Sequence, residues 1–465
     1  MTTLDALFRA APVRSDAVVD GDRRLTSGDL DAEAERVAGA LNARGIGHGD
    51  HVAFQLPIGW ETIALYRACW RVGVVPVALH PMAGSAQLDD ALDQSEPSLL
   101  ISAAGMSLDE RPGAEHLDDL TGGAVPAVDV GDDDDALVMF TSGSSGAPKG
   151  VVHPHRSLVY KARESIDVHG LTAADVVLMP APLAHVSGLL HGVMVPGAAG
   201  AKTVLMRRWD PGAALDLIEA ERVTWMIGPP TFFIGLMDHP AFSSDRVASL
   251  RLLSCGGAGV SPAFVERART EIGAVVKRAY GSTEAPTITT SAHDDPPERM
   301  VSTDGRPFGG SEVRVDDEGE LWLRGPELAR GYLDPDRTAE SFVDGWFRTG
   351  DLATIDDGWV TITGRLGDRI IRGGENISAT EVEHHLEAHP SVRHAVAVAE
   401  PDERLGERVA AFVIAPDGFD VSTCRAWFEE RGAARFITPE RIEVVDEFPV
   451  LTSGKVDRAT LASRL

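Results

Sequence analysis

A ten-residue loop of small polar residues carries the clearest chemical signal in the sequence. Thr141–Gly150 reads TSGSSGAPKG, with four hydroxyls, three glycines and one lysine. Hydroxyls, bare backbone N–H groups and an ammonium group together form a cradle for an anion, and glycines let the backbone approach a phosphate closely. A flexible linker is the alternative, but the apolar runs Leu137–Phe140 and Val151–Val152 predict a strand on either side. The loop is also not a Walker loop, which ends in Gly-Lys-Ser/Thr and opens a helix.

Four apolar runs further along the chain each end in a polar or glycine-rich corner. The runs and their corners are Val176–Met179 with Pro182–Gly188, Val223–Ile227 with Gly228–Thr231, Leu252–Ser254 with Cys255–Gly259, and Val275–Ala279 with Tyr280–Glu284. In open parallel sheets, ligands bind in the crevice at the carboxyl ends of the strands. We therefore expect these corners to converge on one cleft.

The elements that must position these corners begin with an alternation of helices and strands. Thr26 is a predicted N-cap, and a helix over Trp60–Val72 separates predicted strands at Val52–Leu56 and Val74–Leu79. The stretch Asp109–Asp135 is rich in Gly, Pro and Asp and is predicted to be a loop region. The strand–helix–strand rhythm predicts an α/β fold, in which mostly parallel sheets are covered by helices.

The pattern changes after Pro307. Glu320–Arg324 and Trp359–Thr363 alternate polar and apolar residues or carry β-branched ones, which indicates antiparallel strands in a β-rich subregion. A hairpin is predicted over Ile370–Ile377, followed by further helices and strands. Roughly the last hundred residues are enough for a small α+β domain of their own.

The bulk composition limits the class of protein. A chain of 465 residues is too long for a single hydrophobic core of ordinary size, so two or more domains are expected. The net charge, 43 − 71 = −28, disfavours nucleic acid or an anionic membrane as the main partner. We expect no membrane span and no secretory signal, since no apolar run is long enough. Three scattered cysteines, Cys69, Cys255 and Cys424, predict a reducing, cytoplasmic setting without a disulfide framework.

Five motifs in a fixed order resemble those of the acyl-adenylate-forming superfamily. They are Thr141–Gly150, Tyr280–Glu284, Gly345–Asp351, Gly364-Arg365 and Ser453–Lys455. This superfamily includes acyl- and aryl-CoA synthetases, peptide-synthetase adenylation domains and luciferases, and the resemblance runs from about Leu25 to the C-terminus. It implies ATP-dependent formation of an acyl-AMP from a carboxylic acid, with Mg²⁺ as cofactor, followed by transfer of the acyl group to coenzyme A.

The resemblance also implies a role for each motif residue. The phosphates would be held by Thr141, Ser142, Gly143, Ser144, Ser145, Gly146 and Lys149. Thr283 would contact the α-phosphate, and Glu284 would bind the metal ion. The nucleoside would be contacted by Gly257, Ala258, Tyr280, Gly281, Ser282, Asp351 and Arg365. Simpler interpretations remain for three of these: Glu284 as a helix-terminal carboxylate, Tyr280 as a core aromatic residue, and Asp351 as a turn residue.

Two catalytic groups and a moving lid follow from the same resemblance. Lys455 would reach the reacting carboxylate, and His185 would border it. Without the resemblance, Lys455 would be interpreted as an exposed lysine and His185 as a histidine packed in the core. The lid, residues 367–465, would rotate about Gly367 relative to the large domain, residues 1–366. That rotation would replace Lys455 by a hairpin whose Gly373, Gly374 and Glu375 border the coenzyme A tunnel.

The expected acyl pocket is apolar and uncharged. Its predicted lining is Val186, Gly188, Met226, Ile227, Phe232, Phe233 and Pro286. The absence of an acid after His185 argues against an α-amino acid, so a hydrophobic acid is expected, whether aryl, alicyclic or medium-chain. Because no carrier domain follows Leu465, the acceptor is expected to be free coenzyme A. The alternatives are a separate carrier protein, a luciferase-like oxidation, or a nucleotide-binding regulatory protein; a homodimer is left open.

Overall fold

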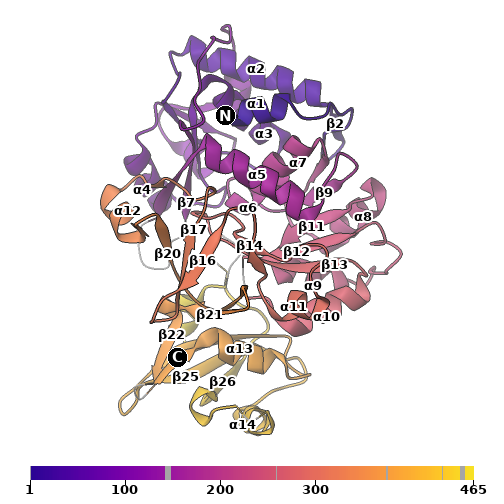
Figure 1. Ribbon diagram of the computed structural model, residues 1–465, viewed down its shortest axis with the longest axis vertical. Helices are drawn as coiled ribbons and strands as arrows, with labels where there is room; N and C mark the ends of the chain where they lie inside the picture. Colours follow the sequence, from indigo (N-terminus) through magenta and orange to yellow (C-terminus); the bar gives the residue numbers. More distant parts are fainter. Residues whose placement is uncertain (1, 142–147, 258, 373–374, 432, 451–455) are drawn as a thin grey trace.

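The computed structural model describes residues 2–141, 148–257, 259–372, 375–431, 433–450 and 456–465. Within these ranges the strands form four sheets. Two large sheets with their helices fill the upper and right-hand parts of Figure 1, a β-rich sheet lies to the left of the nine-stranded one, and the last sheet lies below them. The amino terminus lies in the upper part and the carboxyl terminus in the lowest part (Figure 1).

The first large sheet has seven strands in the order β18-β8-β7-β4-β3-β5-β6. Its strands are β3 (His51–Gln55), β4 (Val75–Ala78), β5 (Leu99–Ser102), β6 (Ala114–His116), β7 (Asp135–Thr141), β8 (Lys149–Pro154) and β18 (Gly331–Tyr332). Strands β3 to β7 pair in parallel, whereas β8 returns antiparallel to β7. The region predicted as loop over Asp109–Asp135 contains β6, so that prediction was wrong there; the three-residue strand is too short to leave a periodic pattern.

The second large sheet has nine strands in the order β15-β14-β13-β12-β11-β9-β10-β1-β2. Its strands are β1 (Val18–Asp20), β2 (Arg23–Leu25), β9 (Val176–Met179), β10 (Lys202–Leu205), β11 (Trp225–Gly228), β12 (Leu252–Gly256), β13 (Val275–Tyr280), β14 (Thr289–Thr290) and β15 (Arg306–Pro307). The strands from β13 to β1 are parallel to one another. The predicted α/β class with mostly parallel sheets is confirmed.

Helices cover both large sheets. They are α1 (Leu4–Arg9), α2 (Ser27–Ala43), α3 (Trp60–Val72), α4 (Ser85–Ser95), α5 (His155–His169), α6 (Val186–Leu189), α7 (Val195–Ala199), α8 (Pro211–Glu221), α9 (Pro230–Met237), α10 (Pro262–Glu271) and α11 (Pro297–Ser302). The predicted N-cap Thr26 begins α2, with its hydroxyl accepting from the Asp29 N–H at 3.0 Å and the Asp29 carboxylate accepting from the Thr26 N–H at 2.8 Å. None of the helices in the described ranges is long and apolar enough to cross a membrane.

The largest hydrophobic core joins the inward faces of the two large sheets. Phe54 and Met139 of the seven-stranded sheet, Trp225 of the nine-stranded sheet and Leu158 of α5 all belong to this core. A second core lies on the other face of the nine-stranded sheet, under α8, α9 and α10. Successive side chains of a buried strand therefore point into two different cores. This alternation determines which side chains of the strand face the ligand side.

The two smaller sheets are largely antiparallel. The β-rich sheet contains β16 (Glu312–Val315), β17 (Glu320–Arg324), β19 (Phe342–Val343), β20 (Trp346–Asp356) and β21 (Trp359–Arg365), with α12 (Pro335–Ser341) beside it. The last sheet contains β22 (Arg369–Arg372), β23 (Glu375–Ser378), β24 (His394–Asp402), β25 (Gly406–Ile414) and β26 (Arg441–Val444), with α13 (Ala379–Glu387), α14 (Val421–Glu430) and α15 (Arg458–Ala462). Among the described residues, this last sheet has its own core, which includes Val382, Ala411 and Phe428.

Candidate active site

The carboxyl ends of four neighbouring parallel strands meet at one edge of the nine-stranded sheet. These strands are β9, β11, β12 and β13. Gly228 and Tyr280 are the last residues of β11 and β13, and His185 and Gly257 lie in the corners after β9 and β12. The corners that the sequence placed after apolar runs therefore belong to one edge, where open parallel sheets bind their ligands.

The phosphate-loop prediction falls on a hairpin whose two ends are described. Thr141 at the end of β7 pairs with Lys149 at the start of β8, so the hairpin holds the loop at both ends. Among the residues between them, those predicted to hold phosphate lie outside the described residues: Ser142, Gly143, Ser144, Ser145 and Gly146. The ammonium group of Lys149 lies 5.3 Å from the centroid of the Tyr332 ring, a distance typical of a cation–π contact.

The motif at the end of β13 is a tight turn. A Cβ added to Gly281 would lie 2.2 Å from the Thr287 backbone nitrogen, so only glycine allows this close approach. Ser282 and Ala285 bond each other twice: the Ser282 N–H donates to the Ala285 carbonyl, and the Ala285 N–H donates to the Ser282 hydroxyl. The turn is therefore rigid before any ligand binds.

A buried histidine holds Thr283 in this turn. Nε2 of His153 lies 2.7 Å from the Thr283 carbonyl oxygen, and because a carbonyl only accepts, Nε2 carries the hydrogen. Burial lowers the pKa of His153 to about 4, so the ring is neutral at neutral pH. His153 thereby fixes the backbone from which the Thr283 side chain projects.

Glu284 is buried and bonded to a tyrosine of another sheet. The Tyr332 hydroxyl donates to Oε1 of Glu284 at 2.7 Å, and the Ala329 N–H donates to the Glu284 carbonyl oxygen at 2.8 Å. No cluster of three or more His, Cys, Asp or Glu side chains suited to a metal ion occurs in the described part of the chain. A single carboxylate with one free oxygen nevertheless fits Mg²⁺ that arrives with phosphates, since that ion takes one or two carboxylates and keeps other oxygens around it.

Asp351 lies between a tyrosine and an arginine. Its Oδ2 accepts from the Tyr280 hydroxyl at 2.6 Å, and its Oδ1 accepts from Nε of Arg365 at 2.5 Å. Asp351 and Arg365 are direct cross-strand partners on β20 and β21. The residue is only 6% exposed, so the structure supports a held carboxylate rather than a plain turn residue.

His185 begins α6 at the end of the corner after β9. Its Nδ1 accepts from the Ser187 N–H at 3.2 Å, which orients the ring at the helix start. Gly188 in the next turn is packed so tightly that a Cβ there would lie 2.0 Å from the Pro182 carbonyl oxygen. Val186 between them is half-buried.

The structure divides the predicted acyl-pocket residues between two faces. Ile227 lies in the core shared with α5, whereas its neighbour Met226 and also Phe233 lie in the core under α8, α9 and α10. Met226 points away from Ile227, because consecutive residues of a strand point to opposite faces. Phe233 of α9 packs into the same core as Met226, so these two residues do not join the others. Phe232 stacks on Trp209 with ring centroids 4.4 Å apart. Pro286, the last predicted lining residue, is buried.

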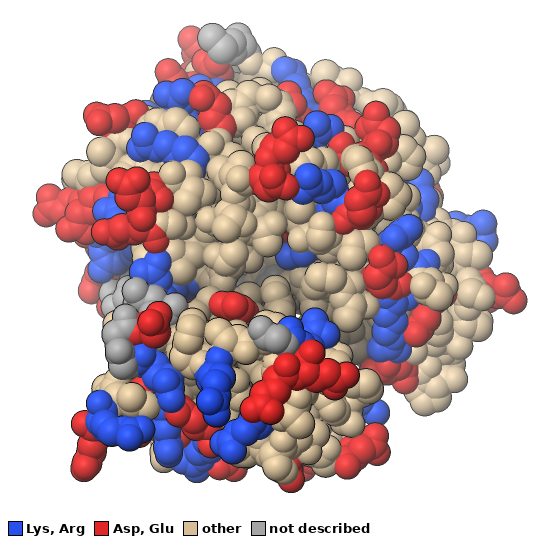
Figure 2. Space-filling model, turned by 60° about the horizontal axis from the view of Figure 1, so that its bottom comes forward, with Lys and Arg blue, Asp and Glu red and all other residues tan. Residues whose placement is uncertain are grey.

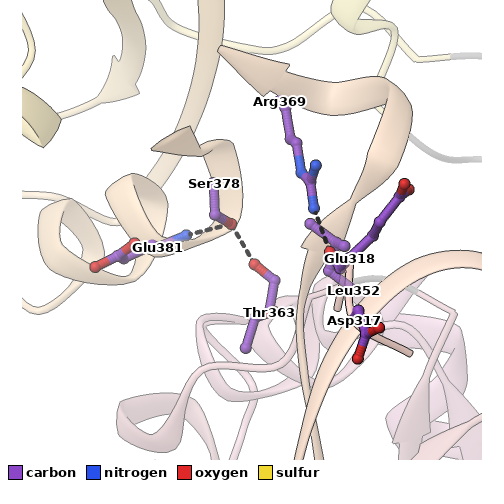
Figure 3. A pocket seen from close by; sticks show the side chains of 7 residues that line it. All are labelled: Asp317, Glu318, Leu352, Thr363, Arg369, Ser378 and Glu381. Carbon is purple, nitrogen blue, oxygen red and sulfur yellow. Dashed lines mark hydrogen bonds between the residues drawn. The ribbon is translucent and has the colours of Figure 1, made fainter. Parts of the chain in front are cut away.

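A cleft of about 640 Å³ lies between the β-rich sheet and the last sheet. Its lining residues are Asp317, Glu318, Leu352, Thr363, Arg369, Ser378 and Glu381 (Figure 3). Two hydrogen bonds join residues before and after Gly367: Nη2 of Arg369 donates to the Glu318 carbonyl at 2.8 Å, and the Ser378 hydroxyl donates to the Thr363 carbonyl. Figure 2 shows the groove between the larger and smaller parts of the molecule, bordered by both acidic and basic side chains.

Part of the predicted lid chemistry cannot be placed. Glu375 is exposed at the start of β23, directly opposite Arg372 of β22. Gly373, Gly374, Ala258 and Lys455 lie outside the described residues.

Comparison with known proteins gives the family. The model of the AMP-binding enzyme family matches residues 7–333, and that of the AMP-binding enzyme C-terminal domain matches residues 381–455. The chain belongs to the AMP-binding enzyme family. This confirms the predicted acyl-adenylate-forming superfamily.

Relatives of this AMP-binding enzyme include two ligases. The medium-chain fatty-acid–CoA ligase of Escherichia coli (strain K12) is 35% identical over 97% of this chain and 88% of its own length. The feruloyl-CoA synthase of an Amycolatopsis species is 35% identical over 96% and 95%. ATP-bound MatB from Rhodopseudomonas palustris superimposes with a TM-score of 0.91 at 27% identity, covering 100% of this chain and 99% of that one. Family and relatives confirm the predicted enzyme class, the AMP-forming acid–thiol ligases.

Two residues of this AMP-binding enzyme near the site were not predicted from sequence. They are His153 and Tyr332, neither of which is among the residues to which the motifs assign a role. The only local signal for His153 is its place four residues after Lys149 on the strand that leaves the loop. Tyr332 is 183 residues from Lys149 in sequence, and it is brought to the site because β18 pairs with β8.

Proposed function

We propose that the protein activates a hydrophobic carboxylic acid with ATP and then transfers the acyl group to coenzyme A. One observation carries the ATP part. The turn Tyr280–Glu284 is bonded on one side to Asp351 and on the other side to Tyr332, which also contacts Lys149. Groups suited to a nucleoside and groups suited to phosphates therefore lie on opposite sides of one rigid turn. The acyl-CoA ligases among the relatives support the choice of acceptor.

The first step forms the acyl-AMP. A carboxylate oxygen of the acid attacks the α-phosphorus of ATP, an O–P bond forms, and the bond to the β-phosphate breaks to release pyrophosphate. Anions must be brought together, so positioned cations and N–H donors supply most of the assistance. We assign Thr141 and Lys149, with the loop between them, to the β- and γ-phosphates, Thr283 to the α-phosphate, and Lys455 to the reacting carboxylate. Mg²⁺, held through Glu284, would neutralise phosphate charge.

The nucleoside would lie beside Tyr280. We assign the Tyr280 ring and the backbone at Gly257 and Gly281 to the adenine, and Asp351 to the ribose hydroxyls. Arg365 would hold the Asp351 carboxylate in its orientation through its hydrogen bond to Oδ1. Both Asp351 oxygens already accept one hydrogen bond, but a carboxylate has about four acceptor sites, which leaves room for two ribose hydroxyls.

The second step forms the thioester. The sulfur of coenzyme A attacks the acyl carbon, and AMP leaves. We propose that residues 367–465 act as a lid on residues 1–366, that the lid rotates near Gly367, and that the hairpin with Gly373, Gly374 and Glu375 then borders the thiol path. The bonds of Arg369 and Ser378 across the hinge would hold the lid in the orientation seen here.

The acid is proposed to be hydrophobic. Five predicted residues remain as the proposed pocket wall, and none of them carries a charge: Val186, Gly188, Ile227, Phe232 and Pro286.

The test is ATP–pyrophosphate exchange measured with a panel of aryl, alicyclic and medium-chain acids. We expect exchange with at least one hydrophobic acid, and AMP release that then depends on coenzyme A. No exchange with any acid would contradict the proposal. Exchange without coenzyme A-dependent AMP release would instead indicate a carrier protein as acceptor.

A further inference from the structure

Tyr332 contacts two opposite charges through two different parts of its side chain. The face of its ring lies 5.3 Å from the ammonium group of Lys149, and its hydroxyl donates to Oε1 of Glu284 at 2.7 Å. Lys149 and Glu284 do not form an ion pair with each other in the described structure. The tyrosine therefore satisfies each charge separately.

The position of Tyr332 is determined by its surroundings rather than by these two contacts. Tyr332 pairs with Val151 across β18 and β8, and its N–H donates to the Thr338 hydroxyl at 2.8 Å. Its ring meets the Phe342 ring edge-on at 5.8 Å, and the residue is only 8% exposed.

Removing this side chain would leave two opposite charges facing one cavity. Glu284 is buried and Lys149 is half-buried, so the effective dielectric constant between them is lower than that of water and their attraction is stronger than in bulk solvent. A collapsed pair would use the lysine that the phosphates need and the carboxylate that the metal ion needs.

We propose that Tyr332 is a positioning residue that keeps Lys149 and Glu284 apart, so that the first is available for phosphate oxygens and the second for the accompanying metal ion. This inference rests on the proposed function. It assigns different tasks to the two halves of one side chain: the ring serves Lys149, and the hydroxyl orients the carboxylate of Glu284.

The two tasks can be separated by two substitutions. Tyr332→Phe keeps the ring and removes the hydroxyl, whereas Tyr332→Leu removes both. Tyr160→Phe is the matched control, since it also removes a tyrosine hydroxyl that is bonded in the fold, in this case to the Gly310 N–H. The measurement is calorimetric binding of ATP, first in EDTA and then with Mg²⁺, on the full chain without any acid.

For Tyr332→Phe we expect ATP binding in EDTA to stay within about twofold of wild type, while the gain in affinity on adding Mg²⁺ falls about fivefold to tenfold. For Tyr332→Leu we expect binding in EDTA to fall about tenfold as well, because Lys149 becomes paired. The double variant Tyr332→Leu/Glu284→Gln should recover the binding in EDTA, since the partner charge is gone. Tyr160→Phe should match wild type.

Equal effects of Tyr332→Phe and Tyr332→Leu in both buffers would overturn the inference, and so would a failure of Glu284→Gln to restore binding. Thermal unfolding of each variant identifies those that do not fold. Should Tyr332→Leu fail to fold, Tyr332→Phe and Glu284→Gln carry the test, because their effects on the Mg²⁺ gain should then be non-additive. Wild type that does not bind ATP at all would contradict the proposed function itself, which is a different result.

Discussion

The hydroxyl of Tyr280 donates a 2.6 Å hydrogen bond to Oδ2 of Asp351, although the two residues are 71 positions apart. Tyr280 ends β13 of the nine-stranded sheet, and Asp351 lies in β20 of the β-rich sheet. The bond therefore joins two sheets at the proposed nucleoside site. It sets the carboxylate beside the aromatic ring before any nucleotide binds.

Asp351→Ala should raise KM for ATP strongly, and Tyr280→Phe should raise it mildly. The first removes a charged acceptor worth about 1.5–3 kcal/mol, or roughly a tenfold to hundredfold rise in KM for ATP. The second removes one neutral donor worth about 1 kcal/mol, or roughly fivefold. ATP–pyrophosphate exchange with ATP, 2′-deoxy-ATP and 3′-deoxy-ATP measures both.

The control for these variants is Asp356→Asn on the same strand, whose carboxylate pairs with Arg299 at the surface. It should leave KM for ATP unchanged. If Asp351→Ala still prefers ATP over both deoxy analogues as strongly as wild type does, Asp351 does not contact the ribose.

Lys455→Ala should cripple the first step and spare the second. Its ammonium group is proposed to act only on the reacting carboxylate and the α-phosphate, whereas the thiol attacks after the lid has moved. Exchange should therefore fall by orders of magnitude, while added acyl-AMP still reacts with coenzyme A. Lys149→Ala is the comparison, because it should raise KM for ATP more than it lowers kcat. An equal loss of both half-reactions in Lys455→Ala would remove this assignment.

Gly367→Pro should slow thioester formation more than adenylation. Gly367 lies in the short 3₁₀ turn Leu366–Asp368, and proline restricts its own φ and the conformation of the preceding residue. Gly367→Ala is the control, since a Cβ there would meet no atom within 4 Å. Single-turnover measurement of each half-reaction gives the comparison, and an unchanged thioester rate in the proline variant would place the hinge elsewhere.

Stability should fall on acidification between about pH 6.5 and pH 4. Burial lowers the pKa of His153, His155 and His191 to about 4. Unfolding returns each to about 6.5, so in this window the unfolded chain binds protons that the folded chain does not, and stability is lost as the pH falls. The full difference corresponds to roughly 3 kcal/mol for each histidine. The thermal midpoint measured from pH 7.5 to pH 4.5 should drop.

The variant that isolates this effect is His155→Asn. The Asn side chain offers an acceptor near the position of His155 Nδ1, which takes the Leu4 N–H at 3.2 Å, and it does not titrate. The midpoint should then depend less steeply on pH than in wild type, whereas replacing the exposed His293 should leave the slope unchanged. A slope identical in all three proteins would show that buried histidines do not govern acid sensitivity.

Much of the fold follows from local sequence signals. The bounds of α3 and β9 coincide with the predicted Trp60–Val72 and Val176–Met179, because periodicity, caps and glycines act over a few neighbouring residues. The chemistry of each motif can also be recognised from its residue types. The anion-binding loop and the glycine-rich corners could therefore be predicted without knowing which of their residues contact one another.

The faces of the buried strands were not predictable in the same way. Met226 and Ile227 are both apolar and both buried, so their sequence does not say which one points to the ligand side. A strand buried on both faces lacks the alternation that would reveal its orientation. The packing of helices on each side of the sheet decides it, and it takes Met226 and Phe233 out of the predicted pocket.

The sequence by itself indicated an anion-binding loop, because phosphate binding favours glycines, hydroxyls and cations at short spacing. The order of its five motifs resembles that of the acyl-adenylate-forming superfamily, and this resemblance implied the reaction class. Only the tertiary structure decided how those residues are held. Tyr332 reaches Lys149 and Glu284 through β18, and His153 reaches Thr283 across 130 positions. Such contacts depend on which strands pair and in which register, and pairing is a property of the whole chain rather than of any segment.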